Sequence, residues 1–152
     1  MRVSTQFPIA FHALLMIARF PDRKVTSDMV AASAGCNAVI IRNIFTKLKA
    51  VGLLSVKAGR GETTLAKPQE EITLWDIYAA IESEKTDEMF KIHANMSGAC
   101  PVGSNVRSLL LGHLDDALNA MKKELSKVTL KTALDELGER LCEGSDNRNS
   151  AV

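Results

Sequence analysis

The sequence predicts a mainly α-helical fold with one small β-hairpin wing and one unusually long helix. Apolar residues recur at helical spacing along most of the chain, and two short β-prone runs flank a tip bounded by glycines. Acidic residues are absent from residues 29–61, where basic residues gather. The elements follow from these patterns in order.

Two helices are predicted before residue 36. In residues 5–20 the apolar positions fall at steps of three and four residues, and Pro8 lies in the first turn, where a missing N–H costs little. After the polar break "PDRKVTSD", Thr26 or Ser27 can cap a short second helix that carries Met29 and Val30 inward and ends at Gly35.

A third helix over residues 38–51 and a hairpin complete the first half. The buried stripe of this helix is predicted to be Ile40, Ile41, Ile44, Phe45, Leu48 and Val51. The runs "LLSVKAG" and "TTLAKP", separated by "GRGE", are typical of a hairpin. Three helices and a two-stranded wing make residues 1–68 a winged helix-turn-helix domain.

Residues 69–142 are expected to form a second, helical region with a sensor loop. Thr73 precedes a helix that holds Trp75 in the core, and residues 93–103 lack periodicity. A long helix then begins near Ser104. Alternating steps of three and four residues give it a coiled-coil seam, which predicts self-association: Leu111, Leu114, Leu118, Met121, Leu125 and Val128. A last helix follows Thr129, and residues 143–152 are expected to be a disordered tail.

The basic residues coincide with the elements that dock on duplex DNA in such a domain. The net charge of the 152 residues is only +1, so the excess of positive charge on the third helix and the hairpin is a local feature and not a property of the whole chain. Candidate groove contacts are Asn37, Arg42, Asn43 and Thr46. Candidate phosphate contacts are Ser27, Lys47, Lys49 and Lys57, with Arg60 placed to enter the minor groove. The competing interpretation is a solvated basic surface.

Composition argues against several other classes. The apolar runs are far shorter than the roughly 20 residues of a membrane span, and the N-terminus lacks a signal cleavage pattern, so a soluble cytoplasmic protein is expected. The three cysteines, at positions 36, 100 and 142, indicate neither a disulfide framework nor a metal knuckle. His12, His93 and His113 form no metal-binding pattern, and a nucleophile-base spacing is lacking, so neither a metal site nor an enzyme is expected.

The order and spacing of several segments resemble the Rrf2 family of transcriptional regulators, and within it the YwnA-like branch. They are "FHALLMIA", "VTSDMVAASAGCNAVIIRNIFTKLKAVGLL", the wing "GRGETTLAKPQEEITLWDIYAAIE" and the loop "CPVGSNV" before the long helix, over residues 1 to about 140. The resemblance implies a dimeric winged-helix DNA-binding protein, in most members a repressor. Several members sense redox state, nitric oxide or iron-sulfur status through a cluster held by three closely spaced cysteines in that loop.

This chain departs from the family in its cysteines. The loop holds Cys100 alone, which is too few ligands for an iron-sulfur cluster, so no cofactor is expected. Cys100 is either a thiolate activated at the helix start, and so a redox switch, or a small side chain packed beside Pro101 and Val102. Cys36 and Cys142 are expected to be structural.

The sequence therefore favours a homodimeric regulator, a repressor, that binds double-stranded DNA at a pseudo-palindromic operator in response to an unidentified effector. One alternative is a winged-helix protein-interaction or sensor module with little specific DNA binding. A second is an enzyme that uses Cys100 as a nucleophile, for which the sequence offers no base.

Overall fold

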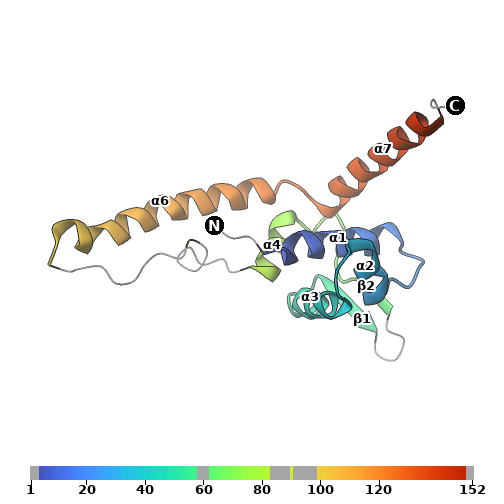
Figure 1. Cartoon of the computed structure of the whole chain (residues 1–152), viewed down its shortest axis with the longest axis horizontal. Coiled ribbons are helices and arrows are strands. Elements are labelled where there is room, and N and C mark those ends of the chain that lie inside the picture. Colours follow the sequence, from blue (N-terminus) through green and yellow to red (C-terminus); the bar gives the residue numbers. More distant parts are fainter. Residues whose placement is uncertain (1–3, 58–61, 83–89, 91–98, 150–152) are drawn as a thin grey trace.

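The computed structural model describes residues 4–57, 62–82, 90 and 99–149 (Figure 1). The predicted mainly α-helical fold with a two-stranded wing is confirmed. The elements discussed below are, in order, α1 (Gln6–Arg19), α2 (Ser27–Ala34), α3 (Ala38–Ala50), β1 (Leu54–Lys57), β2 (Glu62–Leu65), α4 (Leu74–Ile81), α6 (Pro101–Leu125) and α7 (Leu130–Asn149).

Helices α2 and α3 form the helix-turn-helix. The Thr26 hydroxyl accepts a hydrogen bond from the Met29 N–H at 3.3 Å and begins α2, and Gly35 ends it with a φ of 64°. This left-handed conformation favours glycine. The Asn37 side-chain oxygen then accepts a hydrogen bond from the Val39 N–H at 2.8 Å and begins α3. The turn is therefore specified by local capping.

The buried stripe of α3 lies at the centre of the core. Ile41, Ile44, Phe45 and Leu48 are buried, together with Ala10, Ala13, Leu14 and Ile17 of α1 and with Val30 and Ala31 of α2. Two predicted core positions are wrong, since Met29 and Val51 are exposed. Met29 lies in the first turn of a short helix that buries one narrow stripe, and Val51 follows the last residue of α3, where the backbone leaves the helical path.

The wing is an antiparallel pair of strands in which Leu54 faces Leu65, Val56 faces Thr63 and Lys57 faces Glu62. Leu54 and Thr63 are buried, so the base of the hairpin is packed on the core and its direction relative to α3 is set there.

Helix α4 closes the core beside α1. Its capping box is complete, since the Asp76 N–H donates to the Thr73 hydroxyl at 3.2 Å and the Thr73 N–H donates to the Asp76 carboxylate at 2.9 Å. The buried Trp75, predicted as a core residue, is stacked on Tyr78 with ring centroids 5.2 Å apart.

The long helix α6 extends away from the body formed by α1 to α4 and the hairpin (Figure 1). It begins at Pro101, earlier than the predicted Ser104, and ends at Leu125. Val128 therefore lies beyond the end of α6 and is not part of its apolar seam. Its carbonyl accepts a hydrogen bond from the Leu74 N–H at 2.9 Å. No single helix among the described residues is long and apolar enough to span a membrane; α2 and α3 reach that limit only as a pair bent by 117°.

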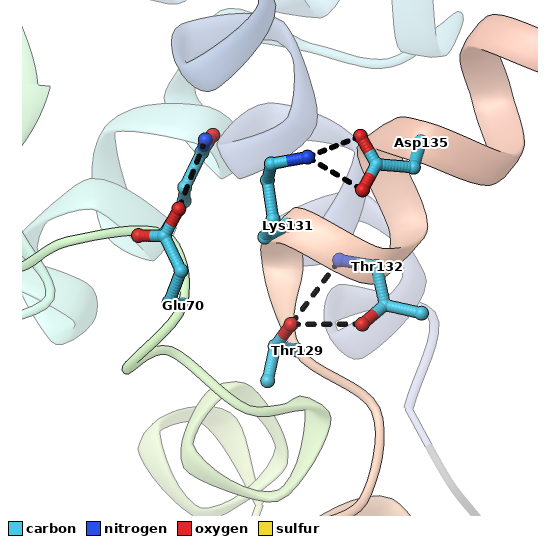
Figure 2. Close-up of polar contacts among 6 residues, drawn as sticks. Glu70, Thr129, Lys131, Thr132 and Asp135 are labelled. Carbon is cyan, nitrogen blue, oxygen red and sulfur yellow. Dashed lines mark hydrogen bonds and ion pairs between the residues drawn. The ribbon is translucent and has the colours of Figure 1, made fainter.

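The chain returns to the core at the start of α7. The Leu130 N–H donates to the Ile72 carbonyl at 2.7 Å, and the Leu130 side chain is buried. Figure 2 shows the first turn of α7, where the Thr132 N–H donates to the Thr129 hydroxyl at 3.1 Å and Lys131 pairs with Asp135. Helix α7 continues to Asn149, so it extends into residues 143–149, where the sequence analysis expected a tail outside the helices.

The two threonine N-caps of α4 and α1 differ in a way that stability measurements can detect. Thr73→Ala removes the capping box and should lower the free energy of unfolding by about 1 kcal/mol. Thr5 also precedes a helix, but its side chain makes no capping hydrogen bond. Urea denaturation should therefore find Thr5→Ala close to wild type, and equal losses for the two variants would contradict the capping assignment.

Candidate nucleic-acid interface

The face of α3 opposite the core carries polar and basic side chains. Arg42, Asn43, Thr46 and Lys49 are all exposed. Positions 42, 46 and 49 are separated by four and three residues, so they share one face of the helix. Burial of the apolar stripe therefore turns these side chains outward together, as the sequence predicted.

Val39 also lies on this face, seven residues before Thr46 and three before Arg42, and 54% of it is exposed. An exposed branched apolar side chain at the start of a reading helix can contact a thymine methyl group in the major groove. Val39 is outside the polar candidates that the sequence indicates, and its position three residues before Arg42 is the sequence signal that places it on this face.

Asn37 and Thr46 are exposed but already engaged. The Asn37 oxygen caps α3, which leaves its amide NH2 group for a ligand. The Thr46 hydroxyl donates to the Arg42 carbonyl at 2.9 Å, which leaves its lone pairs to accept. The structure thus limits the direction in which each group can hydrogen-bond.

Lys47 points elsewhere than the sequence analysis expected. Its ammonium group donates to the Gln6 side-chain oxygen at 2.9 Å and to the Ile81 carbonyl at 3.4 Å. It therefore ties α3 to the start of α1 and the end of α4. Position 47 lies on the flank of α3 that faces these two helices, whereas the sequence analysis placed Lys47 among the candidate phosphate contacts.

An open depression of about 360 Å³ separates α2, α3 and the wing. Its lining includes Lys24, Ser27 and Arg42 with the apolar side chains of Phe45 and Val56. Ser27 is the first residue of α2, where free N–H groups and the helix dipole favour an anion. Only the backbone of Lys57 is described, and Arg60 lies outside the described residues.

Cys100 precedes the first residue of α6 and is exposed among the described residues. Hydrogen bonds from the backbone N–H groups of Gly103 and Val102 lower the pKa of the Cys100 thiol. They stabilise the thiolate, the form that oxidants and alkylating reagents attack.

The described histidines and cysteines do not assemble a metal site. His12 shares a hydrogen bond of 2.9 Å with the Ser33 hydroxyl, as expected of a structural histidine, and His113 is exposed on α6. His93 lies outside the described residues. Within the described ranges, no three His, Cys, Asp or Glu side chains are grouped so that they could hold a metal ion.

Helix α6 has no buried residue. Its predicted seam is partly covered at Leu111, Leu114, Leu118, Met121 and Leu125, while Val102 and Leu109 are 69% and 65% exposed. Where α6 contacts α4, the ammonium group of Lys122 lies 5.4 Å from the centroid of the Trp75 ring. Exposed apolar side chains along a helix of 25 residues make α6 a candidate interaction surface.

Known proteins share this architecture. A family model described as "Rrf2: Iron-dependent Transcriptional regulator" matches residues 3–136. YwnA of Bacillus subtilis (strain 168), named as an HTH-type transcriptional regulator, is 30% identical over 89% of this chain and 98% of its own length.

Two solved structures are similar along most of their length. A protein described as DNA binding superposes with a TM-score of 0.71 at 26% identity, over 86% of this chain and 99% of its own. A transcriptional regulator from Lactobacillus plantarum superposes with a TM-score of 0.76 at 22% identity, over 95% of this chain and 97% of its own. The second likeness bears on the fold alone.

The lowered pKa of Cys100 can be measured through its alkylation. In a Cys36→Ser/Cys142→Ser variant, the rate of iodoacetamide labelling should rise with pH around the pKa of Cys100. Because the folded pKa lies below that of the unfolded chain, the midpoint should fall at lower pH in buffer than in concentrated urea. Coinciding midpoints would show that the start of α6 does not stabilise the thiolate.

Proposed function

We propose that this chain, which belongs to the Rrf2 family of transcriptional regulators, is a homodimeric repressor that reads a pseudo-palindromic operator with two copies of α3. Members of the family are regulators and not enzymes. The observation that carries the proposal is the outward face of α3, where Arg42, Asn43, Thr46 and Lys49 are exposed beside the wing.

The side chains divide by their chemistry. Base edges in the major groove suit Arg42 and the polar groups of Asn37, Asn43 and Thr46, because arginine and asparagine match the hydrogen-bonding patterns of guanine and adenine. Ser27, Lys49 and Lys57 suit phosphates, and Arg60 suits the minor groove next to the wing. Lys47 is left out of this set because its ammonium group is held by Gln6 and Ile81.

The homodimer is supported by α6. We assign residues 1–68 to DNA reading and residues 69–142 to pairing and sensing. A two-fold axis along the α6 seam gives two copies of α3 with a fixed separation, which in turn sets the spacing of the half-sites. A change in how α6 begins would then alter that separation.

Cys100 is the proposed sensor for that change. It is exposed at the start of α6, and the local N–H groups favour its thiolate. The loop before α6 carries Cys100 as its one cysteine in the sequence, which is too few thiolates for the family's cluster. A redox response through the thiol is therefore proposed without a cluster.

The roles on α3 can be separated by salt dependence. A duplex selected by the full-length protein from a randomised library serves as the probe, and its affinity is measured by fluorescence anisotropy at several salt concentrations. Lys49→Ala should weaken binding to all duplexes alike and reduce the salt slope by about one counterion, while Arg42→Ala should cost about 1 to 3 kcal/mol on the selected duplex and blur base preference.

Lys47→Ala is the matched control and should leave the salt slope unchanged. If it flattened the slope as much as Lys49→Ala, the assignment of the two lysines would be wrong. Weak binding of the wild type with no preference among sequences would instead favour the interaction or sensor module without specific DNA binding.

Pairing through α6 predicts that a charge in the seam separates the protomers. Leu118→Glu and Met121→Glu should convert a dimer to a monomer in sedimentation velocity, because each buries a carboxylate against apolar side chains. Asn119→Glu places the same charge on an exposed position of the same helix and should leave the dimer intact. A dimeric Leu118→Glu variant would place the interface elsewhere.

A further inference from the structure

One acidic residue interrupts the basic stretch of sequence that forms α2, α3 and the first strand of the wing. Asp28 is the only Asp or Glu between Asp22 and Glu62. It lies in the first turn of α2 and its side chain is 73% exposed. Its carboxylate oxygen Oδ1 is 3.4 Å from Nη2 of Arg42, whose side chain is 60% exposed. An acid thus contacts the arginine at the centre of the reading face.

Stability alone is a weak reason for this contact. An ion pair between two exposed side chains contributes little to folding. The first turn of α2 already has its hydroxyl cap from Thr26, and an added carboxylate there gains only a modest interaction with the helix dipole. Against duplex DNA the same carboxylate repels phosphates, so its presence beside Arg42 carries a cost to binding.

We infer that Asp28 is a positioning residue that confers base specificity through Arg42; the inference rests on the proposed function. The guanidinium group has five N–H donors in a rigid fork. When Asp28 engages Nη2, the orientation of the fork is restricted and the remaining donors stay available for a base edge. Arg42 lines the open depression between α2, α3 and the wing, so its guanidinium group lies at the edge of the candidate interface.

The carboxylate of Asp28 also disfavours a competing contact, in which Arg42 binds a phosphate instead of a base. An unrestrained arginine on this face can turn to the nearest phosphate, a contact that adds affinity for any sequence. A negative charge next to the guanidinium makes that alternative less favourable, so binding to unrelated DNA is weakened more than binding to the operator. Specificity gained by penalising the wrong partner is a general device in recognition.

The test compares two duplexes of equal length: one selected from a randomised library by the full-length wild type, and a scrambled version of it. Asp28→Asn should raise affinity for the scrambled duplex and lower the ratio of the two affinities by about 3- to 10-fold. Asp22→Asn, which removes an exposed acid outside the helix-turn-helix, should leave the ratio unchanged. Thermal melting checks that both variants remain folded.

A double-mutant cycle tests whether Asp28 acts on specificity through Arg42. In an Arg42→Ala background, Asp28→Asn should no longer change the ratio, because the arginine it positions is gone. Equal gains in affinity for both duplexes, or the same change of ratio with and without Arg42, would overturn the inference and leave Asp28 as a source of general repulsion. If the library yields no enriched duplex, the proposed function itself fails, which is a different outcome from an enriched duplex with an unchanged ratio.

Discussion

Burial of one stripe of α3 is the constraint on which the rest of the structure depends. Ile41, Ile44 and Leu48 are fully buried against α1 and α4. Because of the helical period, the side chains on the opposite face of α3 then point to solvent. The same packing sets the base of the wing through Leu54 and Thr63. The core stripe and the proposed DNA-reading surface are therefore two faces of one helix, and a change that rotated α3 would disturb both together.

A second constraint acts at the other end of the chain. Helix α6 has no buried residue and runs from its distal start at Pro101 toward the body (Figure 1). Just after it, the Leu130 N–H donates to the Ile72 carbonyl, so α6 is attached to the body at its C-terminal end. Lys47 adds a link between α3 and the end of α4, through Ile81. These contacts join the end of α6 that lies beside the body to the elements that pack on α3.

Much of the fold could be predicted from the sequence because its signals are local. Thr26, Asn37 and Thr73 cap helices as their residue types suggest, and the periodicity of α3 identified its core stripe. The failures concern contacts between elements. The side chain of Lys47 was judged by its charge, yet Gln6 and Ile81, distant in sequence, hold it; Asp28 went unnoticed because its partner lies in the next helix. Val51 and Val128 were assigned to helices that end before them.

The central claim is that two outward faces of α3 meet one DNA duplex from a paired molecule. Hydroxyl-radical footprinting on a duplex selected by the full-length protein tests it most directly. The account predicts two protected patches related by a dyad, with centres about one helical turn, roughly 10 base pairs, or a multiple of it apart. A single patch, or uniform weak protection along the duplex, would contradict it.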